Sequence, residues 1–168
     1  IPIAETKQEV IDFFMHFGEI NLGKQTVLCK DTPAFIANRI GVMSGVKVFD
    51  LTQQYDLTIE MVDALTGSLI GRPNTGTYRL QDLVGLDTGE KVTQFVVENV
   101  TNDSFFEKLG KSLETKCMSF LLEKNFLGNQ TGKGFYEKTN QKDSNGKTII
   151  NALDLKTLEY KPSKTYVL

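Results

Sequence analysis

The sequence predicts an all-α domain that ends in a short β-hairpin-like tail. Apolar residues recur at helical spacing through most of the chain, most clearly over residues 35–49 and 59–70. Residues with capping side chains and glycines divide this pattern into several helices. Short β-like runs occur only near the end, at residues 148–154 and 158–160, so the tail is the one part expected to form strands.

The first predicted helix covers residues 6–17. Thr6 and Glu9 have the spacing of a capping box, in which each side chain satisfies an N–H group of the first turn. His16 is the only histidine and therefore the obvious candidate base. No carboxylate or nucleophile is placed nearby to pair with it, so we interpret His16 as non-catalytic. After Gly23, residues 25–29 are predicted to be extended.

Residues 30–40, KDTPAFIANRI, predict the start of a long helix. Asp31 and Thr32 are favourable N-cap residues, and Pro33 suits the first helical position, where its missing N–H costs nothing. The apolar pattern carries this helix to about Tyr55. It also predicts that this helix and the one over residues 59–70 form the centre of the domain.

One face of the long helix carries only small side chains and one amide. It comprises Ala34, Asn38, Gly41 and Gly45. Glycine inside a helix costs about 0.5–1 kcal/mol relative to alanine. Two glycines on one face therefore predict that a second helix or a ligand approaches the backbone closely.

Asn38 has two interpretations at this point. It could satisfy a neighbouring backbone group, as most buried amides do. Alternatively, its NH₂ group could donate to a substrate oxygen in a cleft, since an amide stays uncharged over the working pH range.

Further capping signals divide the middle of the chain. Residues 56–58 are predicted to end the long helix and cap the next, which reaches Ile70. After a loop at residues 71–76, Thr77 can cap a short helix that Gly85 ends. Asp87 and Glu90 resemble a second capping box, opening a helix to Val100.

The last helical signals precede a glycine-rich segment. A helical turn is expected at residues 105–110 and a helix at about 114–124. Gly132-Lys133-Gly134 is too short for a dinucleotide-binding fingerprint and does not stand between a strand and a helix, so it is predicted to be a loop.

Composition excludes several classes of function. The 168 residues carry a formal charge of −2, which gives no basic surface for nucleic acid. No apolar run approaches the roughly 20 residues of a membrane span. Two cysteines and one histidine lack metal-ligand spacing, so we expect no metal site and two reduced thiols in a cytoplasmic protein. Because the chain starts at Ile1, we expect it to be cut from a longer polypeptide.

Three stretches together resemble the 3-hydroxyacyl-CoA dehydrogenase family. Residues 30–40 resemble its K-D-T-P-G-F-I-x-N-R-[IL], residues 82–87 match D-L-V-G-L-D, and residues 131–136 match T-G-x-G-F-Y. They occur in the family's order and spacing, and the resemblance covers roughly residues 1–137. It implies the helical C-terminal domain of the 3-hydroxyacyl-CoA and 6-phosphogluconate dehydrogenase-like type, which forms dimers and one side of the substrate cleft.

The resemblance also implies site residues. The family's asparagine falls on Asn38, where it helps to position and polarise the 3-oxygen of an acyl-CoA substrate. The catalytic His, its partner Glu and the NAD-binding domain would precede residue 1, and His16 does not match the catalytic His. The T-G-x-G-F-Y loop approaches NAD, commonly with a lysine before the threonine; Gln130 occupies that place, so an amide contact is expected instead of an ionic one.

A departure from the family pattern indicates a subgroup. Residues 70–79 replace the P-M-G-P-F of many relatives and resemble the bacterial enzymes fused to a downstream enoyl-CoA hydratase. We therefore expect a helical domain over residues 1–137, a hairpin and linker over residues 138–168, and a homodimer. Two alternatives stay open: a non-catalytic helical dimerisation or interaction module, and a related hydroxyacid dehydrogenase of similar architecture.

Overall fold

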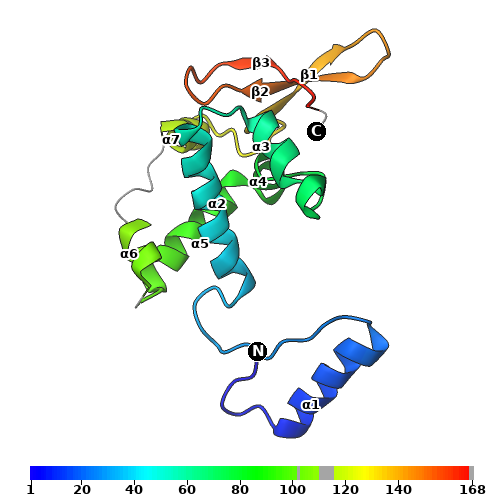
Figure 1. The fold of residues 1–168 in the computed structure, drawn as a ribbon, viewed down its shortest axis with the longest axis vertical. Helices are drawn as coiled ribbons and strands as arrows, with labels where there is room; N and C mark the ends of the chain where they lie inside the picture. The colour runs from blue at the N-terminus through cyan, green and yellow to red at the C-terminus, as the bar shows by residue number, and fades with distance from the viewer. Residues whose placement is uncertain (102, 110–115, 167–168) are drawn as a thin grey trace.

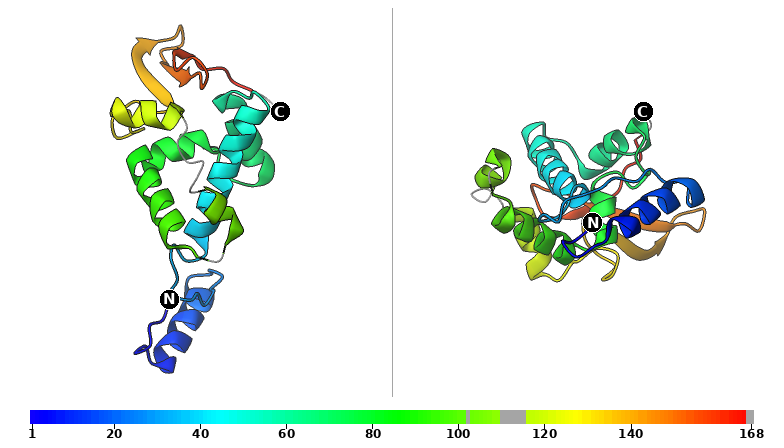
Figure 2. Two further views of the ribbon diagram at one scale, coloured as in Figure 1. Left: turned by 90° about the vertical axis from the view of Figure 1, so that its left-hand side faces the viewer. Right: turned by 90° about the horizontal axis from the view of Figure 1, so that it is seen from below.

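The computed structural model describes residues 1–101, 103–109 and 116–166. A body of helices lies in the middle, a small β-sheet covers one end of it, and α1 lies apart at the other end (Figure 1). Figure 2 shows the same separation of α1 from the side. The structure therefore confirms the helical fold with a β tail.

The N-terminal helix lies outside the helical body. Helix α1 (Gln8–His16) continues as the π-helical turn η1 (Phe17–Asn21). The predicted capping box is wrong, because the N-cap is Lys7 and the Thr6 hydroxyl instead accepts from the N–H of Ile3. The apolar face of α1 is open to solvent, with Phe13 59% and Phe14 61% exposed. Residues 25–29, which were predicted to be extended, form no helix and pair with no strand of the described chain.

Helix α2 (Ala37–Gln54) begins four residues later than predicted and ends where predicted. Ala34 and Phe35 have φ angles of 62° and 52°, which a helix cannot accommodate. The Phe35 N–H closes a turn onto the carbonyl of Thr32. Ala34 is buried against Val96 and its neighbours in this turn, so packing overrides the N-terminal signal at Pro33.

Capping is correctly predicted at α3 and wrongly at α4. The Thr58 hydroxyl accepts from the N–H of Met61 at the start of α3 (Ile59–Thr66). The single helix that was predicted to reach Ile70 is interrupted at Gly67, and the short 3₁₀ helix η2 (Ser68–Ile70) follows. Thr77 precedes α4 (Tyr78–Val84) but makes no side-chain cap. The carboxylate of Asp63, from α3, caps α4 instead.

Three further helices complete the body. They are α5 (Leu86–Asn99), α6 (Ser104–Leu109) and α7 (Lys116–Glu123). The second predicted capping box is wrong, because the N-cap of α5 is Gly85 and no side chain caps the helix. The first residues of the helix expected from about residue 114, and residue 110 of the preceding turn, lie outside the described residues. None of the helices that the described residues form combines the length and apolar character needed to cross a bilayer.

The tail forms a three-stranded antiparallel sheet rather than a two-stranded hairpin. Its order is β1 (Tyr136–Lys142), β2 (Thr148–Leu153) and β3 (Tyr160–Pro162). Strand β1 starts at Tyr136 and so crosses the boundary expected after residue 137. Ala152 and Leu153 of β2 are buried in one core with Ile59 of α3. The sheet thus shares its core with the helices.

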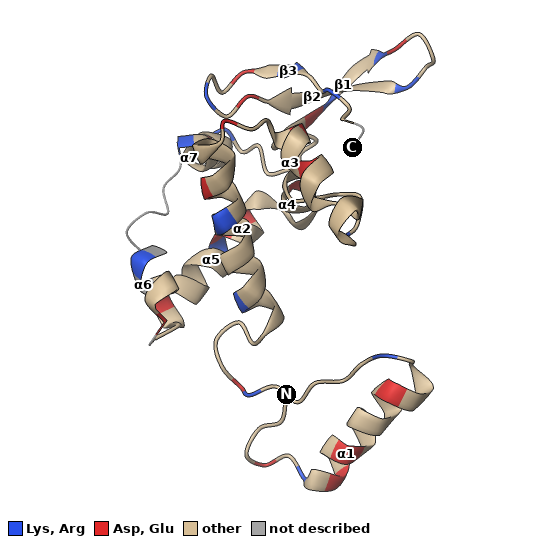
Figure 3. Ribbon diagram, in the orientation of Figure 1, with Lys and Arg blue, Asp and Glu red and all other residues tan. Residues whose placement is uncertain are grey.

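In the view of Figure 3, Lys and Arg as well as Asp and Glu occur in the helical body and in the sheet, whereas α1 carries Asp and Glu but no Lys or Arg. Cys29 and Cys117 are both free thiols.

Candidate functional site

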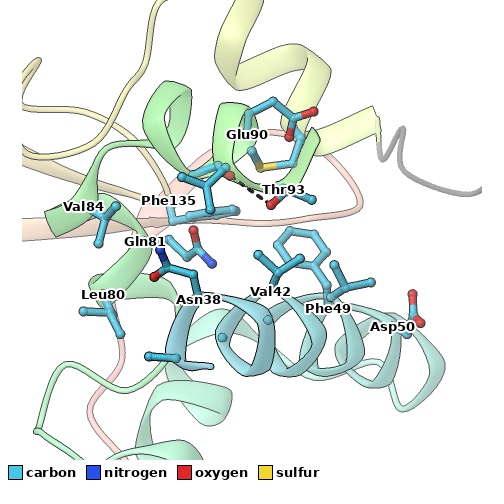
Figure 4. Close-up of a pocket in the computed structure, with 17 residues that line it drawn as sticks. Asn38, Val42, Phe49, Asp50, Leu80, Gln81, Val84, Glu90, Thr93 and Phe135 are labelled. Carbon is cyan, nitrogen blue, oxygen red and sulfur yellow. Dashed lines mark hydrogen bonds between the residues drawn. The ribbon is translucent and has the colours of Figure 1, made fainter. Parts of the chain in front are cut away.

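A cavity of about 290 Å³ lies between α2, α4 and α5 (Figure 4). Its walls are mainly hydrophobic, with Asn38, Asp50, Gln81, Glu90 and Thr93 as polar members. The larger apolar side chains around it are Val42, Val46, Phe49, Leu80, Val84, Val92, Met118 and Phe135. An apolar pocket with a few polar groups is the usual form of a small-molecule site.

The small-residue face of α2 opens onto this cavity. A Cβ added to Gly41 would meet no atom within 4 Å, and one added to Gly45 would meet only the side chain of Gln81, at 3.5 Å. Among the described residues, only the Gln81 side chain of α4 comes close to these two positions, so the face leaves room for a ligand. Ala34 precedes α2 and does not belong to the face.

Asn38 lies at the N-terminal end of the cavity with its side chain exposed. Its amide makes no hydrogen bond with any residue that the structure describes. Asn38 also borders a second cavity, of about 460 Å³, formed with residues 31–35 and with Lys91 and Phe95 of α5. The amide is thus available to a ligand from either space.

Gln81 is a second amide in the first cavity, and sequence reasoning missed it. Its Nε2 lies 3.5 Å from the position of a Cβ on Gly45, and its Oε1 lies 3.2 Å from that of a Cβ on Gly89. The two glycines therefore leave room for this side chain between α2 and α5. The only sequence signal for Gln81 was a polar residue within the apolar pattern of a short helix. Such a pattern is common in sequences, so it is a weak indication of a site.

Two of the family-like stretches meet at Asp82. Its Oδ1 accepts from the N–H of Phe135 and its Oδ2 from the N–H of Tyr136, each at 2.8 Å. Burial raises the pKa of Asp82 to about 6, while the two N–H donors favour the ionised form. Residues 82–87 and 131–136 therefore form one structural unit, in which Asp82 fixes the loop and places Phe135 beside the cavity.

A second buried carboxylate, Asp63, joins three parts of the fold. It accepts from the N–H groups of Thr77, Tyr78 and Arg79 at 2.8, 2.6 and 3.1 Å, and from the Tyr136 hydroxyl at 2.7 Å. Burial raises the pKa of Asp63, and these donors oppose that rise. The guanidinium carbon of Arg79 lies 3.9 Å from the centroid of the Tyr136 ring. Since all these contacts are internal, we assign Asp63 to the fold and not to chemistry.

The glycine-rich loop does not provide a phosphate cradle. Its N–H groups, which such a cradle would need, are already used: Gly128 and Lys133 donate to each other's carbonyl, and Gly134 donates to Tyr136. Lys133 lies over the rings of Phe126 and Tyr160 and pairs with Glu137 at 2.6 Å. As predicted, this segment is a loop.

The structure does not bring all predicted site residues together. Gln130 is exposed and donates from Nε2 to the Asp87 carboxylate at 2.9 Å, and it is not among the residues that line the cavity with Asn38. His16 is exposed on the separated α1. In the described part of the chain, no group of three metal-ligating side chains comes together.

Comparison with known proteins places this fold among dehydrogenases. The 3-hydroxybutyryl-CoA dehydrogenase of Escherichia coli superposes with a TM-score of 0.63, at 24% identity, over 84% of this chain and 28% of that one. This likeness shows the fold. The helical body is therefore the fold of part of a hydroxyacyl-CoA dehydrogenase.

The sequence comparison identifies the family. Residues 35–138 match the 3-hydroxyacyl-CoA dehydrogenase, C-terminal domain, and the chain belongs to this family. A "Probable 3-hydroxyacyl-CoA dehydrogenase" of Bacillus subtilis is 41% identical over 160 residues, or 95% of this chain and 19% of that protein. A relative from Rickettsia prowazekii, whose name describes a fatty acid oxidation complex trifunctional enzyme, is 30% identical over 93% of this chain and 21% of its own length. The chain thus spans about a fifth of the length of these two relatives.

Proposed function

We propose that this chain forms the substrate-cleft part of an NAD-dependent dehydrogenase of fatty-acid β-oxidation, which oxidises (S)-3-hydroxyacyl-CoA to 3-oxoacyl-CoA. The observation that carries the proposal is the position of Asn38. Its exposed amide has no partner among the described residues and borders an apolar cavity, within a stretch that belongs to this family.

The role of Asn38 is to donate a hydrogen bond to the 3-oxygen of the substrate. The amide is neutral at every working pH, so it can polarise this oxygen without exchanging a proton. A fixed donor that faces developing charge stabilises the transition state more than the ground state. The neighbouring apolar walls, which include Val42 and Phe49, suit the hydrocarbon part of an acyl-CoA.

NAD supplies the acceptor of the hydride in the proposed reaction. The N–H groups of Gly128, Lys133 and Gly134 are already paired within the loop, so this loop does not fit the role of main NAD site. We assign that role, and the catalytic base, to a domain that precedes Ile1 in a longer polypeptide. Gln130 can offer the cofactor an amide contact at the edge of this domain.

The remaining architecture follows the same proposal. The helical body, with the sheet that shares its core, forms a dimerisation and substrate-cleft domain, and the chain beyond β3 leads towards a downstream hydratase domain in a cytoplasmic homodimer. Phe13 and Phe14 of α1 are exposed, which supports the idea that another protein surface covers this helix in the longer polypeptide or the dimer. The trifunctional name of the Rickettsia relative supports fusion to other activities.

The test compares two purified proteins: this chain alone and the longer polypeptide that carries it. NADH formation is followed by absorbance with (S)-3-hydroxyacyl-CoA and NAD. We expect activity from the longer polypeptide and none from this chain, because its glycine-rich loop offers no dinucleotide cradle and the catalytic base is assigned to a preceding domain. NADH formation by this chain alone, or inactivity of the longer protein, would overturn the proposal.

A second candidate is a non-catalytic helical dimerisation module. The apolar side chains that α1 exposes favour it, because a large exposed apolar patch commonly marks an interaction surface. Sedimentation shows whether this chain self-associates. Titration with NAD or an acyl-CoA shows whether it also binds ligand, which a pure dimerisation module would not do.

A further inference from the structure

Gln81 lines the cavity between α2 and α5. Its amide nitrogen is next to Gly45 of α2 and its amide oxygen is next to Gly89 of α5, so the side chain reaches across the space between them. Figure 4 shows the Asn38 and Gln81 side chains projecting into the same space above α2. Both amides therefore face this cavity.

The Gln81 amide is unsatisfied within the protein. The residue is half-buried, and its side chain makes no hydrogen bond with any described residue. The same cavity is also lined by apolar side chains such as Val84 and Phe135. Before a ligand enters, water can satisfy the amide; a hydrocarbon that displaces this water cannot.

The position of Gln81 along the cavity determines which part of a ligand it meets. Asn38 and Gly45 are seven residues apart on α2, which corresponds to a rise of about 10 Å. A chain that starts with its reacting oxygen at Asn38 and runs along α2 towards Phe49 must pass Gln81. A short chain ends before it.

We propose that Gln81 is a specificity-determining residue that makes the enzyme favour short acyl chains over long ones. This inference rests on the proposed function, because it takes Asn38 as the site of the substrate's 3-oxygen. A long acyl chain covers the amide with methylene groups that offer it no hydrogen bond. A short chain leaves the amide hydrated.

The test uses the longer polypeptide and a series of (S)-3-hydroxyacyl-CoA substrates from four to sixteen carbons. Gln81→Met keeps the length and flexibility of the side chain and removes its polar group. The ratio of kcat/KM for the sixteen-carbon substrate to that for the four-carbon substrate should rise about tenfold, mainly through a lower KM for the long substrate. Gln81→Ala, which also removes bulk, should raise this ratio at least as much.

Gln94→Met provides the matched control, since Gln94 is exposed on α5 and lies away from the cavity. It should leave the ratio unchanged. A wild-type enzyme that already prefers long chains, or a Gln81→Met ratio within about twofold of wild type, would overturn the proposed role of Gln81 and leave the proposed function standing. If the wild-type enzyme oxidises none of the substrates, the proposed function fails as well.

Discussion

The Asp82 carboxylate accepts a hydrogen bond from the backbone N–H of Tyr136 at 2.8 Å, across 54 positions of sequence. This bond joins the end of α4 to the start of β1. A Cβ on Gly134 would collide with the same carboxylate, so the loop approaches Asp82 as closely as a glycine allows. The two family-like stretches are therefore spaced to meet in the fold. The carboxyl group that joins them, that of Asp82, has a pKa raised to about 6.

The first prediction concerns the pH dependence that Asp82 gives to stability. Burial raises its pKa from 3.8 to about 6, so the folded state holds this proton more tightly than the unfolded state. The resulting stabilisation is complete below about pH 4 and is lost as the pH rises through about 6. Urea unfolding of this chain and of Asp82→Asn measures the effect. We expect wild type to lose about 3 kcal/mol of stability relative to the variant as the pH rises from about 4 to above about 6.

Carboxylates that do not interact with Asp82 cancel from this difference, because they titrate alike in both proteins. Asp154 is one of them: its hydrogen bond from Lys161 lowers its pKa to about 2. A difference between wild type and Asp82→Asn that stays constant or grows from about pH 4 to about pH 7 would contradict the prediction.

The second prediction concerns Asp63 as the cap of α4. Asp63→Asn leaves one acceptor oxygen where the carboxylate serves three N–H groups and the Tyr136 hydroxyl. We expect the free energy of unfolding to fall by about 2–4 kcal/mol, because buried donors lose their partners. Tyr136→Phe removes one of these contacts and should cost about 1 kcal/mol. Chemical denaturation measures both variants.

Glu98→Gln is the control for this series, since Glu98 is an exposed residue of α5. Its effect should stay within about 0.5 kcal/mol. An Asp63→Asn variant no less stable than Glu98→Gln would show that the cap contributes nothing.

Local signals in the sequence predict those elements whose caps are local. Thr58 caps α3 from three residues away, and α2 ends where its apolar pattern ends. The cap of α4 could not be predicted, because its acceptor is Asp63, fourteen positions before Thr77. The start of α2 was misplaced since the buried Ala34 holds the chain at a positive φ. Strand β1 was missed because its residues are mostly polar and exposed.

The candidate site also contains residues that local spacing predicts and one that it does not. Asn38, Gly41 and Gly45 share one helix, so their common face could be read from spacing alone, and the structure places all three at the cavity. Gln81 reaches that cavity from another helix. Its role depends on the tertiary packing of α4 against α5, which no local pattern encodes.

The third prediction contrasts two glycines. Gly41→Ala should raise the free energy of unfolding by about 0.5–1 kcal/mol, because it lies within α2 and a Cβ there meets nothing within 4 Å. In the longer polypeptide the same change should raise KM, since the added methyl group narrows the cavity. Gly134→Ala should destabilise the fold, because its Cβ would lie 2.6 Å from the Cα of Gly128. A Gly41→Ala variant with lower stability and unchanged KM would show that this face serves packing.

The fourth prediction separates the two interpretations of Asn38. In the longer polypeptide, Asn38→Ala should lower turnover by about 10²–10³-fold, the typical effect of removing one donor to a reacting oxygen. The melting temperature of this chain should not change, because the Asn38 amide is exposed and bonds to no described residue. Asn140→Ala, at an exposed position of β1, controls for the loss of an amide far from the cavity. Normal turnover of Asn38→Ala with a large drop in melting temperature would instead assign Asn38 to the fold and leave the cavity without its proposed donor.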